Sequence, residues 1–355
     1  MSRIDTVLET NQNWVTNRLN AAGLATTNKF IDEYGAMVVP HVCADGRIPT
    51  GFELFGLPSY VVSTYRTPGA VFKMGWRMFG DELSYELRRA AELGCPIVVP
   101  FISHRSERGG KHNCAACAYD RDVAFQTVEQ AHSEVLTWHE QTGVHIFPLL
   151  MELETDSGEV LVCGKNGHRL TSRDLAKGKQ AAYDQVKMVL RDEDFPRMLY
   201  PLVVRMLRGN MEHQLERQQN GIVLDEHNET GIAIGVGYNC LPVGEFLRFS
   251  PFRPDLDRDV GIMSGLLAGN LARLSAVELK ALEPLLLVSL RLSDTSEGGV
   301  FLTQRRVEYL ARKSLEYMGQ SPLADVLGAR LEGLTVLTAT VTNQGLFTPF
   351  PFARD

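Results

Sequence analysis

The sequence predicts an α/β protein in which two related domains form around mixed, largely parallel sheets, the second domain being a degenerate copy of the first. Short β-branched runs alternate with helix-like stretches, segments of the second half repeat segments of the first, and candidate metal ligands are confined to the first half. The 355 residues are enough for two domains, and their 44% hydrophobic and 22% charged content is typical of globular proteins.

Charge and composition exclude several classes of function. The net charge of -7 comes without a basic run, which argues against a nucleic-acid partner. No apolar stretch reaches the roughly 20 residues that cross a bilayer, and polar residues stand at 1–6 where a secretory signal would be apolar. We therefore expect a cytoplasmic protein with reduced cysteines, of which Cys95, Cys163 and Cys240 fill the core.

The predicted elements alternate along the chain. Ile4, Leu8 and Val15 recur at helical spacing, so residues 1–35 are predicted to form an amphipathic arm that lies on another part of the protein. A domain follows at residues 36–190, where apolar β runs and amphipathic helices alternate. Its expected strands are residues 36–43, 60–62, 96–103 and 145–151, and its expected helices are residues 81–94 and 114–140.

Residues 191–355 repeat this pattern faintly. The alignment sets Val236 against Cys43 and Leu292 against His104, so this part is predicted to be a degenerate C-terminal copy without metal ligands. The matching segments are 96–110 with 284–299, 48–51 with 241–244, and 145–151 with 335–341.

Three side chains at the ends of predicted elements form a candidate zinc site. Cys43 and His104 each end an apolar run, and Cys114 begins the next predicted helix, where the helix dipole stabilises a thiolate. Zinc prefers thiolate and imidazole ligands, and three of them leave the fourth tetrahedral position for water, as in catalytic sites. Zinc acidifies such a water toward neutral pH.

Asp45 and Arg47 stand beside the first ligand in Cys43-Ala-Asp-Gly-Arg47. Residues two apart in an extended segment point the same way, so Cys43, Asp45 and Arg47 are expected to face one pocket. Paired with Arg47, Asp45 stays ionised and orients the water on the zinc. The alternative interpretation is a salt bridge that only braces the turn.

The identity of the third ligand is undecided, because two cysteines lie close together in this part of the sequence. Cys114 and Cys117 form a lone Cys-Ala-Ala-Cys; a redox pair would need a thioredoxin-like setting and a zinc ribbon would need a second such pair, and neither is present. We favour Cys114 as the ligand and expect Cys117 to pack against the sheet. His112 is expected in the loop before Cys114, where it is a candidate proton acceptor.

These residues resemble a known family. Cys43-x-Asp45-x-Arg47 followed by Ile-Pro is similar to the first zinc motif of β-class carbonic anhydrases, and residues 60–69 are similar to the strand and glycine turn that follow it. Nine residues separate His104 from Cys114, where ordinary members have two. This wide gap and the fused copy resemble the carboxysomal shell branch, CsoSCA.

The resemblance implies two β-carbonic-anhydrase-like domains and zinc-dependent, reversible hydration of CO2 to bicarbonate and a proton. It also implies Cys43, His104 and Cys114 as zinc ligands, with Asp45 and Arg47 as catalytic residues. The implied partners are CO2 and bicarbonate, further copies of the chain in a homo-oligomer, and the carboxysome shell or Rubisco.

Three points stay open at this stage. Only residues 1–35 precede the first predicted strand, where shell enzymes carry a long extension, so carboxysome residence is undecided. The same site would also suit a hydrolase of carbonyl sulfide or carbon disulfide. A protein of a different class, in which zinc only braces a structural or sensing module, is the third alternative.

Overall fold

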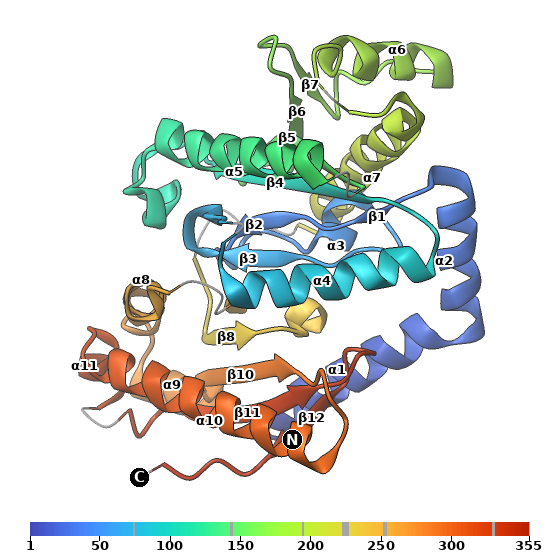
Figure 1. Cartoon of the computed structure of the whole chain (residues 1–355). Helices are drawn as coiled ribbons and strands as arrows, with labels where there is room; N and C mark the ends of the chain where they lie inside the picture. Colours follow the sequence, from blue (N-terminus) through green and yellow to red (C-terminus); the bar gives the residue numbers. More distant parts are fainter. Residues whose placement is uncertain are drawn as a thin grey trace. The chain divides into compact units, whose positions relative to one another are not determined.

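A computed structural model gives the fold (Figure 1) and describes residues 1–73, 75–142, 145–193, 195–221, 227–250, 254–328 and 331–354. The contacts divide the chain into two compact units. The first unit is Asn20–Glu226, and the second unit joins Met1–Leu19 to His227–Asp355. Each unit contains one mixed, largely parallel sheet, which confirms the predicted α/β class.

The sheet of the first unit has the strand order β3-β2-β4-β5-β6-β7, and β1 also pairs with β4. The strands β1 to β5 run parallel to their neighbours, whereas β6 and β7 are antiparallel additions at one edge. Parallel central strands need cover on both faces, which explains their almost continuous apolar sequences. The strands are β1 Met37–Val38, β2 His41–Cys43, β3 Tyr65–Thr67, β4 Ile97–Arg105, β5 Ile146–Glu154, β6 Glu159–Cys163 and β7 Arg169–Thr171.

Helix α5 lies along β4 and β5 (Figure 1) and supplies part of that cover. Its residues Ala124, Val128, Ala131 and Val135 are buried, as the predicted helical stripe requires. The helices of this unit are α2 Ala21–Tyr34, α3 Gly51–Phe55, α4 Arg77–Glu92, α5 Arg121–Thr142, α6 Lys179–Val189 and α7 Tyr200–Gln219.

Two predicted boundaries were wrong. The helix expected from residue 114 begins at Arg121, and Cys114 instead precedes the short 3-10 turn η3, Ala115–Cys117. The helix dipole therefore does not act on the Cys114 thiol as predicted. The β run expected at residues 60–62 contributes one isolated bridge, between Val62 and Val38.

The second unit repeats the topology of the first. Its strand order β9-β8-β10-β11-β12 matches β3-β2-β4-β5-β6, with four parallel strands followed by an antiparallel one. The strands are β8 Gly231–Gly235, β9 Phe246–Phe249, β10 Leu285–Arg291, β11 Thr335–Val341 and β12 Phe347–Phe350. The helices are α1 Arg3–Leu19, α8 Leu256–Leu271, α9 Ala276–Leu282, α10 Glu297–Gly319 and α11 Leu323–Leu327.

A buried arginine marks the same place in both sheets. Arg66 on β3 donates to the carbonyl of Ile48 at 2.8 Å, and Arg248 on β9 donates to the carbonyl of Leu241 at 3.2 Å. Each accepting residue precedes a proline in the repeated segments 48–51 and 241–244. The shared contact therefore supports the predicted duplication.

Strand register shifts the predicted alignment of the two copies. Arg66 pairs with Val42, and Arg248 pairs with Ala233, so the residue equivalent to Cys43 is Ile234. The same reasoning across the next strand sets His104 against Ser289. Neither Ile234 nor Ser289 is a zinc ligand, so the second copy lacks these two ligands in either alignment.

In each unit, one helix comes from the part of the sequence that precedes the sheet of the other unit. Helix α1 precedes the first sheet in the chain but belongs to the second unit, where the buried Asn11 donates to the carbonyl of Gly345 (2.9 Å) and accepts from the N–H of Phe347 (2.8 Å). The predicted arm at residues 1–35 is thus two helices that divide between the units.

Helix α7 makes the corresponding contacts in the first unit. Asn210 donates to the carbonyl of Gly158 (2.8 Å) and accepts from the N–H of Val160 (3.0 Å). Gly209 lets α7 approach α3, because a Cβ there would collide with the carbonyl of Phe55. The predicted domains 36–190 and 191–355 therefore differ from the compact units, since α7 packs with the first sheet.

Candidate metal centre

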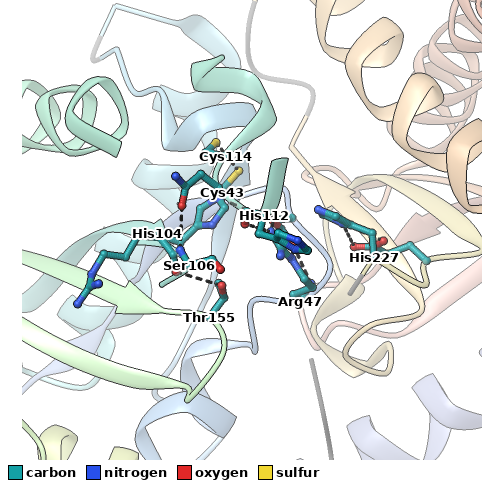
Figure 2. A network of polar contacts seen from close by, with 12 residues as sticks. Cys43, Arg47, His104, Ser106, His112, Cys114, Thr155 and His227 are labelled. Carbon is teal, nitrogen blue, oxygen red and sulfur yellow. Dashed lines mark hydrogen bonds and ion pairs between the residues drawn. The ribbon is translucent and has the colours of Figure 1, made fainter. Parts of the chain in front are cut away.

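Two adjacent parallel strands place the first two candidate ligands at one edge of the first sheet. Cys43 is the last residue of β2, and His104 lies two residues beyond Ile102, the partner of Val42 on β4. The loop that follows β4 returns Cys114 to the same point (Figure 2). The carboxyl edge of parallel strands is where α/β proteins place their sites.

The ligand atoms of Cys43, His104 and Cys114 all lie within 4.8 Å of one another. The two sulfur atoms are 3.7 Å apart, and the three residues are only 4%, 2% and 2% exposed. The structure thus brings together the three predicted ligands. Cys117 does not belong to this group among the described residues, although its side chain contacts that of Cys114.

The chemistry of this group suits zinc. Both ring nitrogens of His104 are buried, and neither has a well-aligned hydrogen-bond partner in the described part of the chain. A buried polar atom without a partner is costly, and a metal ion is one partner that removes the cost. Two cysteines and one histidine, with no fourth ligand atom grouped with them in the described part of the chain, fit the three-ligand pattern of a catalytic zinc site.

The ligands hold their protons tightly. A hydrogen bond with Cys114 and burial raise the pKa of the Cys43 thiol well above its usual range. A hydrogen bond with Cys117, together with burial, raises the pKa of Cys114 to about 12. Burial lowers the pKa of His104, but the neighbouring Cys43 and Asp45 outweigh burial and raise it overall. A metal ion must displace these protons, so binding strengthens as the pH rises.

Asp45 and Arg47 form a buried, two-pronged ion pair beside the ligands. Arg47 Nη2 lies 2.6 Å from Asp45 Oδ2, and Arg47 Nε lies 3.0 Å from Asp45 Oδ1. Asp45 Oδ2 is also 3.9 Å from His104 Nε2, so the carboxylate faces the ligand group, as predicted. The two hydrogen bonds from Arg47 give the buried carboxylate a partner of opposite charge.

Arg66 fixes the main chain that carries these residues, a role that the sequence did not suggest. Its guanidinium donates to the carbonyls of Cys43 (3.2 Å), Asp45 (3.3 Å) and Pro49 (3.0 Å), besides that of Ile48. A charged residue inside the apolar segment 60–69 was the available signal. The contacts could not be predicted, because their acceptors are main-chain atoms about 20 residues away.

The long loop between His104 and Cys114 is held at both ends. Near its start, Ser106 Oγ and the Glu107 N–H donate to the carboxylate of Asp156, at 2.9 Å and 3.1 Å. Near its end, Arg47 Nη2 donates to the carbonyl of His112 at 3.0 Å. The loop is therefore fastened near its start by the carboxylate of Asp156 and near its end by Arg47.

Two further residues fasten the loop, Asn113 and Thr155, of which Figure 2 labels Thr155. Asn113 Oδ1 accepts from the Ser106 N–H at 2.9 Å, and Thr155 donates from both its N–H and its hydroxyl to the carbonyl of Arg105. Cys114 is therefore held by contacts that reach back to β4 and β5.

No family model matches the chain, and no curated protein matches it. Among solved structures, the β-carbonic anhydrase CafA of the fungal pathogen Aspergillus fumigatus is similar over 53% of this chain and 99% of its own, with 15% sequence identity and a TM-score of 0.30. Nothing in these comparisons supports the carboxysomal shell branch or carboxysome residence, which stay predictions. Among the described residues, no helix is long and apolar enough to cross a lipid bilayer.

Proposed function

We propose that this chain is a zinc-dependent carbonic anhydrase that hydrates CO2 reversibly to bicarbonate and a proton. The observation that carries the proposal is the buried group Cys43, His104 and Cys114 with the paired carboxylate of Asp45 facing it. The sequence pattern of these ligands, with Asp45 and Arg47 beside them, resembles that of β-class carbonic anhydrases. This resemblance is the reason for proposing CO2 as the substrate.

Each residue has a definite task in this proposal. Cys43, His104 and Cys114 hold the metal, which when bound supplies a water acidified toward neutral pH. Asp45 would accept a hydrogen bond from that water and orient it, while the two hydrogen bonds from Arg47 hold the carboxylate in place. Arg47 also fixes the loop at His112, so the same guanidinium positions the carboxylate and the approach to the third ligand.

Stopped-flow measurement of CO2 hydration tests the proposal. Wild-type protein loaded with zinc should be active, and Asp45→Asn should retain its zinc while turnover falls by roughly 10²-fold or more, the range for loss of a positioned acid or base. Asp32→Asn, which changes an exposed carboxylate on α2, is the matched control and should remain active. An inactive wild type, or full activity in Asp45→Asn, would overturn the assignment.

Two alternative functions are separated by further measurements. Competition between CO2 and carbonyl sulfide or carbon disulfide decides between a hydratase and a hydrolase at the same site. The absorption spectrum of the cobalt form reports whether a fourth side chain closes the site, as a purely structural role would require. The position of Cys117 outside the ligand group supports the open site.

A further inference from the structure

Cys117 contributes a third sulfur beside the two candidate thiolate ligands. The Cys114 side chain forms hydrogen bonds with both Cys43 and Cys117. Gly69 lies against two of these sulfurs: its N–H donates to Cys43 Sγ at 3.3 Å, and a Cβ on Gly69 would be 3.2 Å from Cys117 Sγ. Cys117 is nevertheless outside the ligand group, so the metal does not need its sulfur as a ligand, although the residue is only 5% exposed.

The backbone holds Cys114 and Cys117 at a separation that a disulfide can span. The Cys117 N–H donates to the carbonyl of Cys114 at 3.1 Å and closes the 3-10 turn. A turn closed in this way keeps its first and fourth Cα atoms within about 7 Å. Disulfides require Cα atoms about 4.4–6.8 Å apart, so the turn needs little adjustment.

We propose that Cys114 and Cys117 are a thiol-oxidation site, and that their disulfide excludes the metal from the centre. The oxidant is a low-molecular-weight disulfide of the glutathione class. The inference rests on the proposed role of Cys114 as a ligand, because a sulfur in a disulfide has no thiolate to offer a metal. Cys114 can therefore either bind the metal or form the disulfide with Cys117, but it cannot do both at once.

The reaction balances without any further component. The Cys117 thiolate attacks one sulfur of the oxidant, which breaks the S–S bond of the oxidant, forms a mixed disulfide and releases one thiolate. The Cys114 thiolate then attacks Cys117 Sγ and releases the second thiolate. Two thiols of the protein are oxidised and one oxidant disulfide is reduced, and the two protons of the protein thiols end on the two released thiolates, which become thiols. Excess thiol reverses both steps.

Peptide mapping distinguishes this pair from every other pairing of the cysteines. Trypsin cuts after Lys111 and Arg121, so Cys114 and Cys117 share one peptide. Their disulfide makes that peptide lighter by two hydrogens and resistant to alkylation, whereas a bond between Cys43 and Cys114 links two peptides. The experiment treats metal-stripped and zinc-loaded full-length protein with oxidised glutathione and measures released zinc with a chromophoric chelator.

We expect the internal disulfide in the metal-stripped protein, slower oxidation by roughly tenfold or more with zinc bound, and recovery of zinc binding after reduction. Cys117→Ser and Cys117→Ala should keep their zinc under the same oxidant, whereas the control Cys163→Ser should lose it as wild type does. A bond between Cys43 and Cys114, mixed disulfides alone, or no oxidation would overturn the inference. These readouts do not depend on CO2 hydration, so an inactive protein with this disulfide would refute only the proposed function.

Discussion

Asn11 and Asn210 make the same pair of hydrogen bonds in the two units of the chain. Each side-chain amide donates to the carbonyl of a hairpin glycine and accepts from the N–H two residues further on. Both asparagines are fully buried. Arg18 and Arg217 follow them at the same spacing and lie against the same glycines, so the equivalence extends over two turns of α1 and α7.

Removal of either amide should destabilise the unit that contains it. Asn210→Ala leaves the carbonyl of Gly158 and the N–H of Val160 without partners, which costs about 2–4 kcal/mol. Urea unfolding measures the loss, and native-state hydrogen exchange shows that it falls on the first unit. Asn11→Ala should have the same effect on the second unit, whereas Asn220→Ala, an exposed change at the end of α7, should change stability by less than about 0.5 kcal/mol.

Zinc analysis should give about one ion per chain, because within the described ranges the set of two cysteines and a histidine occurs in one copy of the fold. Cys43→Ser should abolish high-affinity binding, since it removes a buried thiolate ligand. Cys240→Ser, a change of a buried cysteine in the second unit, should leave the metal content unchanged. Two tightly bound ions per chain would contradict the assignment of the second unit as a copy without ligands.

Arg47→Lys tests whether the pair with Asp45 depends on the positive charge of Arg47 or on its two parallel N–H donors. Lysine keeps the positive charge but cannot reproduce the two parallel N–H donors, so Asp45 would lose its fixed orientation. We expect turnover to fall by roughly 10-fold or more while zinc is retained. Arg191→Lys, which changes an exposed ion pair, is the control. Wild-type turnover in Arg47→Lys would mean that the pair only braces the turn.

Asp156→Ala should weaken metal binding without touching a ligand. The change removes the acceptor for Ser106 and Glu107 and so loosens the loop that carries Cys114. The expected loss in zinc affinity is roughly 10-fold, as for other groups that orient metal ligands. Competition with a chelator of known affinity measures it, with the exposed change Asp192→Ala as control. Equal affinities would show that the loop is held well enough by its remaining contacts.

Acid should destabilise the first unit through its buried histidines. Burial lowers the pKa of His41 and of His132 from 6.5 to about 4. The unfolded chain therefore binds these protons first as the pH falls, so their contribution to stability is complete above pH 6.5 and is lost between pH 6.5 and pH 4. Each histidine should cost on the order of 2 kcal/mol between pH 7 and pH 5.

Urea unfolding at these two pH values measures the effect. His132→Gln should reduce the difference, whereas the exposed change His168→Gln should leave it as in wild type. An unchanged difference in His132→Gln would contradict the assigned cause.

Local sequence patterns predicted that Cys43 and His104 lie close together, because the carboxyl ends of adjacent parallel strands meet at one sheet edge. Cys43 and His104 follow apolar runs and meet at one sheet edge, as expected. The start of α5 was misplaced because Cys114 to Cys117 forms a turn whose shape depends on contacts of Asn113 with residues on both sides of it.

Other features could not be predicted because they join distant parts of the chain through main-chain atoms. Arg66 and Asn210 mostly contact backbone carbonyl and N–H groups, which leave no trace in the side-chain pattern. Helix α7 belongs to the first unit because it contacts α3 and β6, which are distant from it in the sequence. The repeat predicts a boundary at residue 190, whereas the compact unit that contains α7 ends at Glu226.

The exchange of leading helices separates the repeat in the sequence from the compact units. A fragment that ends at residue 190 would lack α7 and its buried residues Leu202, Val203, Met206 and Leu207, whereas a fragment that ends at Glu226 would keep them. Any division of this gene into two folded products therefore has to follow the units and not the repeat.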